Sequence, residues 1–256
     1  MTTKMMQWLA AAAVLACGAA QAAAPTRGVP ASPLQPEKLA STADSTAVRV
    51  LLLQDVAPCG MTSNEEFLNN HEVAFDLLSS AALATIDFAA YTNIVVASDQ
   101  PQSFYDALSV YMPTIKTWVK QGRRTLEFHG ADNGRQLGHW NFKLPNGVSG
   151  NMQVFDAVNL VVNPASPLVK DSPATINGQY ASHDSLNLGP VSSSAVVVTD
   201  SSGAPTLIDY CYGKGRVVVT GMTWEFYFGK SSDDSDPGRI LRKTLKSTTG
   251  KPGCLE

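Results

Sequence analysis

Uninterrupted apolar runs, separated by a segment with helical spacing, are the feature that most constrains this fold. Residues 48–56 (VRVLLLQDV) and 93–100 (NIVVASDQ) are apolar on both faces, as strands inside a parallel sheet must be. Residues 101–122 repeat apolar side chains at helical spacing and end on Gly122, which suits a helix C-cap, while Pro113 is expected to bend or split that helix. Strand, helix and strand at these lengths predict an open, doubly wound, mostly parallel α/β sheet.

The second half of the chain predicts a β-rich excursion. Residues 75–85 and 124–132 add strands to the first half, and the second of them runs into a glycine turn. Pro-Asn-Gly turn chemistry within residues 138–153 predicts a hairpin-like segment, and residues 177–187 (NGQYASHDSLN) are typical of a polar loop. Three strands are predicted next, joined by an Asp-Ser-Ser-Gly turn and a Gly-Lys-Gly turn, before a helix over residues 236–248.

The first 22 residues have the features of a secretory signal peptide. One lysine precedes an apolar run that is too short to span a bilayer of ~30 Å, and Ala20-Gln21-Ala22 forms an A-x-A cleavage site. We therefore expect cleavage after Ala22 and export to the periplasmic or extracellular space. Cys17, in VLAC, is the alternative signal, because a lipobox there would make the protein a membrane-anchored lipoprotein.

Residues 23–46 are rich in Pro, Ser, Ala and Thr and show no apolar period. Such a stretch cannot bury enough apolar surface to offset its ordering entropy, so a disordered linker is expected. Residues 47–256 then form one α/β domain, a length that suits a single core.

Composition argues against some classes of partner, and it does not decide how the cysteines pair. The formal net charge is −3 without a long basic block, so no nucleic-acid partner is expected, and membrane contact is expected only if Cys17 is lipidated. Cys59, Cys211 and Cys254 allow one disulfide and a remaining thiol, or three thiols. Pairing of Cys211 with Cys254 is favoured, because a pinned carboxyl terminus is a common structural use.

Three segments in a fixed order carry a resemblance to a known family. They are WVKQGRRTLEFHGAD (residues 118–132), NPASPLV (163–169) and GKGRVVVTGMTWEF (213–226). In this order and at these separations, the chain resembles the class I glutamine amidotransferase-like fold, a flavodoxin-like architecture. Within that fold it most resembles the trehalose-utilisation (ThuA-like) branch, over roughly residues 48–247.

The resemblance implies that the glutaminase chemistry of the family is missing. In amidotransferases of this fold, a late strand ends in a His-x-Glu pair that activates a cysteine on a strand-to-helix turn. Here that strand is expected to end Thr223-Trp224-Glu225, and His129 stands where the cysteine should be. Nucleophilic acyl transfer needs a thiolate or alkoxide beside a base, so the Cys-His-Glu triad is expected to be absent.

The carboxyl ends of the strands are the expected ligand crevice. The candidate catalytic residues are His129, Glu225 and Asp132. The candidate ligand-binding residues are Asp55, Gly130, His183 and Trp224. His71 and His139 are expected at the surface, and the scattered histidines lack zinc spacing, so no metal and no cofactor are predicted.

Three functions remain open, and the sequence leaves undecided whether the chain is an enzyme. The first is binding of a small polar ligand, such as a carbohydrate, at the strand ends. The second is a hydrolase or isomerase for a sugar derivative, with His129 and either Glu225 or Asp132 as acid and base. The third is a structural or surface-interaction module whose crevice is vestigial.

Overall fold

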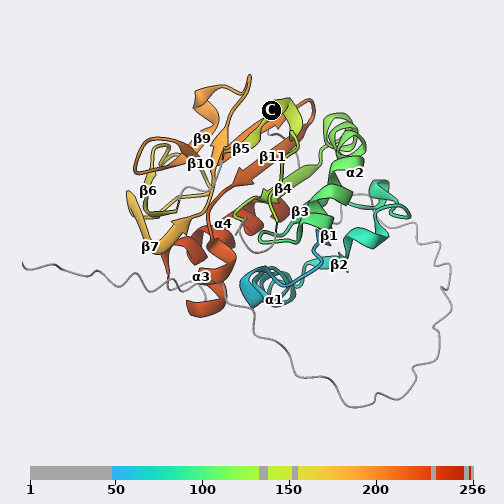
Figure 1. Ribbon diagram of the computed structural model, residues 1–256, viewed down its shortest axis with the longest axis horizontal. Coiled ribbons are helices and arrows are strands. Elements are labelled where there is room, and N and C mark those ends of the chain that lie inside the picture. Colours follow the sequence, from blue (N-terminus) through green and yellow to red (C-terminus); the bar gives the residue numbers. More distant parts are fainter. Residues whose placement is uncertain (1–47, 133–137, 152–154, 232–234, 251–253, 255–256) are drawn as a thin grey trace, which may run out of the picture. The chain divides into compact units, whose positions relative to one another are not determined.

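Among the residues that the structure describes, nine strands form one sheet, in the order β2-β1-β3-β4-β11-β10-β9-β6-β7 (Figure 1). The computed structural model describes residues 48–132, 138–151, 155–231, 235–250 and 254. The predicted signal peptide, Cys17 and the predicted linker therefore lie outside the described residues. Within the described part, no helix is both long enough and apolar enough to cross a membrane.

The first half of the sheet is parallel, as the buried apolar runs predict. Its strands are β2 (Ala74–Leu78), β1 (Arg49–Leu53), β3 (Asn93–Val96), β4 (Thr125–His129) and β11 (Gly215–Thr220). Every residue of β3, β4 and β11 is buried. The doubly wound α/β fold class is thus confirmed.

The second half of the sheet is antiparallel. Its strands are β10 (Pro205–Tyr212), β9 (Val196–Asp200), β6 (Asp156–Val161) and β7 (Thr175–Ser182). The β9-β10-β11 meander is the predicted set of three strands. A separate two-stranded sheet pairs β5 (Ser149–Asn151) with β8 (Ser185–Asn187).

Two sequence predictions for this region are wrong. The segment 138–153 does not close on itself as a hairpin, because β5 takes its hydrogen bonds from the distant β8. The polar segment 177–187 lies mostly in β7 and β8 rather than in a loop, since pairing with β6 and β5 satisfies its backbone groups.

Helices cover both faces of the sheet. They are α1 (Ser63–Asn70), α2 (Gln102–Gln121), α3 (Trp224–Ser231) and α4 (Asp236–Gly250). Short 3₁₀ turns are η1 (Pro58–Gly60), η2 (Ser80–Ala82), η3 (Phe88–Ala90), η4 (Pro145–Gly147) and η5 (Ser193–Ala195). The helix predicted over residues 236–248 is α4. In Figure 1, α1, α3 and α4 lie near one another, whereas α2 lies apart from them.

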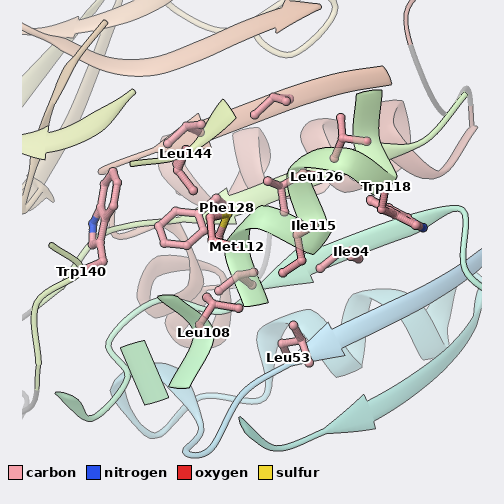
Figure 2. Packing of buried hydrophobic residues seen from close by; sticks show 14 of the residues in the cluster. Leu53, Ile94, Leu108, Met112, Ile115, Trp118, Leu126, Phe128, Trp140 and Leu144 are labelled. Carbon is pink, nitrogen blue, oxygen red and sulfur yellow. The ribbon is translucent and has the colours of Figure 1, made fainter. Parts of the chain in front are cut away.

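Alternate residues of the parallel strands β1, β3 and β11 enter two separate cores. Leu51 and Leu53 of β1 pack with α2 in the first core, while Val50 and Leu52 pack with α1, α3 and α4 in the second. Figure 2 shows the first core, where Leu53 lies near side chains of α2 such as Leu108. Burial on both faces explains why the β1 sequence shows no polar alternation.

Helix α2 continues through Pro113 as one element, so the predicted split does not occur. Proline costs ~3 kcal/mol inside a helix, because it removes a backbone donor and crowds the preceding turn. Met112 and Ile115, on either side of it, are buried in the first core, and their burial offsets that cost. Gly122 is the C-cap of the helix, as predicted.

The aromatic segment after β11 is helical, which corrects the predicted strand end. Strand β11 ends at Thr220, and Trp224 begins α3. Trp224 and Phe228 are four residues apart and both enter the second core, which is helical periodicity rather than strand alternation.

Cys211 and Cys254 form a disulfide with their Cα atoms 5.7 Å apart, which confirms the favoured pairing. The bridge joins β10 to the segment that follows α4. Cys59 keeps its thiol and lies in the loop after β1, where its backbone N–H donates to Asp99 Oδ2 at 3.1 Å.

Leu52 and Leu77 are register partners on neighbouring strands and give a matched test of the two-sided core. Leu52 is fully buried, whereas Leu77 on the edge strand is 46% exposed. We expect Leu52→Ala to lower the free energy of unfolding by about 2–5 kcal/mol, and Leu77→Ala by less than about 1 kcal/mol. Urea unfolding followed by circular dichroism measures both, and equal losses would contradict this packing.

Candidate functional site

The carboxyl ends of β3, β4 and β11 meet at one edge of the sheet, where polar side chains gather. His129 ends β4 and stands in register with Thr220, the last residue of β11. The backbone N–H of Gly130 donates to Thr220 O at 2.6 Å, and that of Asp99 donates to Ala131 O at 3.1 Å. These bonds hold the post-strand segments side by side, so the residues after each strand share one site.

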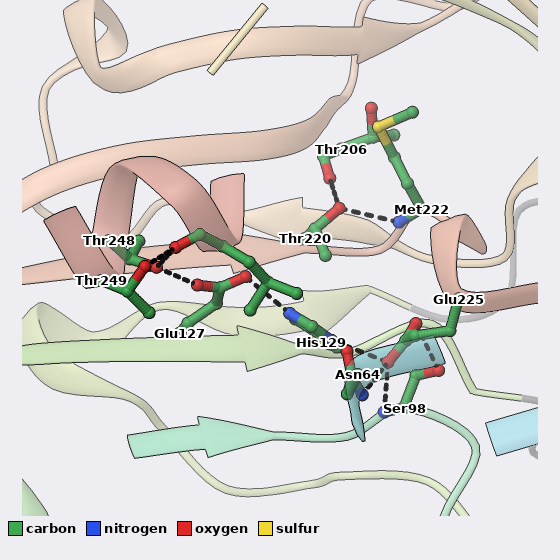
Figure 3. A network of polar contacts seen from close by, with 11 residues as sticks. Asn64, Ser98, Glu127, His129, Thr206, Thr220, Met222, Glu225, Thr248 and Thr249 are labelled. Carbon is green, nitrogen blue, oxygen red and sulfur yellow. Dashed lines mark hydrogen bonds and ion pairs between the residues drawn. The ribbon is translucent and has the colours of Figure 1, made fainter. Parts of the chain in front are cut away.

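His129 lies between two glutamates (Figure 3). Its Nδ1 is 2.7 Å from Glu225 Oε1 of α3, and its Nε2 is 2.9 Å from Glu127 Oε1 of β4. The side chains of all three are at most 1% exposed. Carboxylates only accept hydrogen bonds, so both ring nitrogens act as donors and His129 is a buried imidazolium.

The electrostatics agree with this protonation state. Burial lowers the pKa of His129, but the charges and hydrogen bonds of Glu225 and Glu127 outweigh it and raise the pKa to about 9. Burial raises the pKa of Glu225, yet His129 and Ser98 bring it below its ordinary value. His129 and Glu225 are therefore charged at neutral pH and form a buried pair of opposite charges.

Further donors tie this trio to three other segments of the chain (Figure 3). Glu225 accepts from the Ser98 backbone N–H at 3.1 Å, from Ser98 Oγ at 2.9 Å and from Asn64 Nδ2 of α1 at 3.4 Å. Glu127 Oε2 accepts from Thr248 Oγ1 of α4 at 2.6 Å. The trio thus connects β4 and the end of β3 to α1, α3 and α4.

The structure brings together two of the three predicted catalytic residues. His129 and Glu225 are in contact, whereas Asp132 faces a different group of side chains. Because both His129 nitrogens donate to carboxylates, neither has a lone pair available to accept a proton. A general-base role for His129 would require one of these contacts to break, and a catalytic role stays a prediction.

Asp132 forms a second polar cluster with His139 and Asp184. His139 Nδ1 is 2.6 Å from Asp132 Oδ2, and the Asp132 backbone N–H donates to Asp184 Oδ2 at 2.9 Å. One ligand atom from each of the three side chains lies within 4.8 Å of the others, so the cluster could hold a metal ion. Both aspartates are fully buried, while the His139 side chain is 33% exposed.

Asp184 is the unusual member of this cluster. Burial and the negative charge of Asp132 raise the pKa of Asp184 to about 8. Its Oδ1 atom is buried and has no hydrogen-bond partner within the part of the chain that the structure describes. A buried carboxylate oxygen without a hydrogen-bond partner destabilises the fold unless a proton or a cation compensates its charge.

The predicted ligand-binding residues occupy four different environments. Asp55 is exposed and accepts from Ser80 N and Ser80 Oγ, both at 2.7 Å. Gly130 faces the Trp140 indole, which a Cβ would approach to 2.8 Å. Trp224 is fully buried and packs edge-on against His129, with ring centroids 4.8 Å apart. Of the four, His183 alone lies beside the second cluster.

His183 bridges that cluster to two aromatic rings. Its Nδ1 donates to the Asp132 carbonyl oxygen at 3.2 Å, and burial lowers the pKa of the imidazole to about 4. The ring is therefore neutral at pH 7, with a lone pair on Nε2. Its centroid lies 4.9 Å from that of Phe155 and 6.1 Å from that of Tyr180.

Sequence reasoning did not find the roles of His139, Asp184, Phe155 and Tyr180. His139 was expected at the surface, but only one third of its side chain is exposed. Asp184 is far along the chain from Asp132 and His139, and Phe155 is far from Tyr180, so no local spacing links these residues. The one local signal for the second cluster is the run of polar residues Ser182-His183-Asp184. Strand β7 ends at Ser182, and the backbone N–H groups of His183 and Asp184 donate to Gly221 O.

Comparisons with known proteins bear on this architecture. No protein-family model matches the chain. The uncharacterized protein CA_P0160 of Clostridium acetobutylicum is 28% identical over 204 residues, which are 77% of this chain but 21% of that protein. The chain therefore spans about a fifth of the length of this relative.

Solved structures decide the fold. The cytoplasmic protein STM3548 of Salmonella typhimurium superposes with a TM-score of 0.59 at 15% identity, over 81% of this chain and 100% of that one. A glutamine amidotransferase of Thermotoga maritima gives 0.54 at 13% identity, over 79% of this chain and 98% of that one. The chain has the class I glutamine amidotransferase-like fold. At these identities the likeness concerns architecture alone.

The buried imidazolium predicts a specific pH dependence. Because the pKa of His129 is raised from 6.5 to about 9, its stabilisation is complete below about pH 6.5 and is lost as the pH rises through about 9. We expect His129→Gln to cost about 3–5 kcal/mol of unfolding free energy at pH 6. Between pH 6 and 10 this difference from the wild type should shrink by on the order of 3 kcal/mol.

Denaturant unfolding at a series of pH values measures this effect. His71→Gln is the matched control, since His71 is exposed, and it should differ little from the wild type at any pH. The raised pKa of Asp184 affects both proteins in the same direction and cancels in the comparison. A His129→Gln cost that is constant from pH 6 to 10 would show that His129 is not a buried imidazolium.

Proposed function

We propose that this chain is an exported protein of the class I glutamine amidotransferase-like fold that binds a small polar ligand, carbohydrate foremost, at the strand carboxyl ends. The observation that carries the proposal is the group formed by His183, Phe155 and Tyr180 at that edge of the sheet. We call this group the aromatic rim.

The aromatic rim combines an apolar surface with a hydrogen-bonding ring. Phe155 is 45% exposed although it contacts both Tyr180 and His183 edge to face. Exposed aromatic rings supply large contact area at low entropic cost and can stack on the apolar face of a sugar. Nε2 of the neutral His183 can accept a hydrogen bond from one hydroxyl group of the sugar. The other hydroxyl groups of the sugar would face polar groups of the site.

Two observations support the absence of glutaminase chemistry. His129, in the expected place of the nucleophilic cysteine, is enclosed by Glu127 and Glu225 and carries a proton on each nitrogen. Thr223, in the expected place of the histidine base, donates its hydroxyl to Tyr180 O. We infer that the Cys-His-Glu triad is lost and that its acid, Glu225, has become a structural partner of His129.

The sequence supports the remaining parts of the proposal. The A-x-A site ending at Ala22 supports export, and Cys17 offers an alternative lipid anchor. The order of the segments 118–132, 163–169 and 213–226 supports membership of the ThuA-like branch, whose association with trehalose utilisation favours a sugar ligand.

A ligand screen with one rim variant tests this function. We expect at least one member of a panel of mono- and disaccharides, including trehalose, to stabilise the purified chain, by ~2.7 kcal/mol at one hundred times its dissociation constant. Phe155→Ala should weaken that binding about tenfold in isothermal titration calorimetry, because a stacked ring is lost. Glutamine should yield no ammonia.

The control is Val110→Ala, which removes an apolar side chain that is 70% exposed on α2. It should bind the sugar as tightly as the wild type does. Binding that Phe155→Ala leaves unchanged would place the ligand elsewhere. A panel without any binder would favour a structural or surface-interaction module, and ammonia release from glutamine would contradict the loss of the triad.

A further inference from the structure

We propose that Asp132, His139 and Asp184 bind one divalent transition-metal ion, zinc or manganese, at the carboxyl ends of β4 and β11. We call these three residues the Asp-His-Asp cluster. The site is distinct from the aromatic rim and does not depend on sugar binding.

The donor atoms already converge. One oxygen from each aspartate and one nitrogen from His139 lie within 4.8 Å of one another, and the His139 Nδ1 to Asp132 Oδ2 distance is 2.6 Å. Metal bonds of about 2.0–2.2 Å would need only small side-chain rotations to bring these atoms around an ion. In that arrangement the ion would replace the proton between His139 and Asp132.

The second, independent sign of a ligand is the oxygen Oδ1 of Asp184. This residue has no exposed surface, and its Oδ1 lacks a hydrogen-bond partner among the described residues. A proton on Oδ1 would make it a donor that still has no acceptor there. A cation satisfies the oxygen directly and also places a positive charge between the two buried carboxyl groups of Asp184 and Asp132.

The backbone holds the three ligands in place. Asp132 N–H donates to Asp184 Oδ2 at 2.9 Å, which fixes the second carboxylate relative to the first. His139 N–H donates to the side chain of Gln102 at the start of α2, at 3.0 Å. Gly138 lies against the same helix start, since a Cβ on it would fall 2.5 Å from Gln102 N. These contacts order the ligand positions before an ion arrives.

The donor set selects the class of ion. An imidazole nitrogen with two carboxylates suits zinc or manganese better than calcium, which prefers six to eight oxygens. Three protein ligands leave at least one coordination position open. Because the His139 side chain is 33% exposed, solvent reaches the cluster from that side, and an ion could enter there.

Calorimetry on the metal-depleted full chain tests the proposal. We expect zinc to bind with a stoichiometry of one per chain, with no sugar present, and manganese to compete for the same site. Asp184→Asn keeps the shape of the side chain but removes a charged ligand, and it should weaken zinc binding by at least about tenfold. His139→Gln, at a partly exposed position, should do the same without loss of folding.

The matched control is His71→Gln, which removes an exposed histidine at the C-terminal end of α1 that is not a member of the cluster, and it should bind zinc like the wild type. Two results would overturn the proposal. One is a wild-type chain that takes up neither zinc nor manganese at a one-to-one ratio. The other is zinc binding that Asp184→Asn and His139→Gln leave unchanged, which would assign the ion to another position. Neither result bears on sugar binding at the aromatic rim.

Discussion

The buried hydrogen-bonded trio of Glu127, His129 and Glu225 is the interaction on which the rest of the structure depends. It lies at the carboxyl edge of the sheet and ties β4 directly to α3. Asn64, Thr248 and Ser98 connect it further to α1, α4 and the end of β3. Two buried carboxylates would repel one another, so the imidazolium between them is what permits the arrangement. Loss of that charge would leave buried acids unpaired next to both cores.

The two polar groups at this edge of the sheet have different characters. The trio is fully enclosed, and both side-chain oxygens of Glu127 and of Glu225 accept a hydrogen bond. The Asp-His-Asp cluster has a buried oxygen without a partner among the described residues, and a histidine open to solvent. The first group therefore stabilises the fold, and we propose that ligands bind at the second group and the neighbouring aromatic rim.

Sequence reasoning found the parallel half of the fold because its strands are buried on both faces, as in Val50 to Leu53. It missed β7, from Thr175 to Ser182, because this polar segment pairs with β6 through backbone hydrogen bonds. Such pairing requires no apolar pattern in the sequence. It identified His129 and Glu225 as neighbours through the resemblance of two motifs. It could not find His139 beside Asp184, because tertiary contacts between distant segments create that cluster.

The protonation state of His129 is the most direct measure of this account. Nitrogen NMR of the chain labelled at its histidines, with His129→Gln to assign the signal, reports whether each ring nitrogen carries a proton. The account predicts that both His129 nitrogens stay protonated up to about pH 8, because the pKa is raised to about 9. A neutral ring at pH 7 would contradict the account, because the trio would then lack the imidazolium on which it depends.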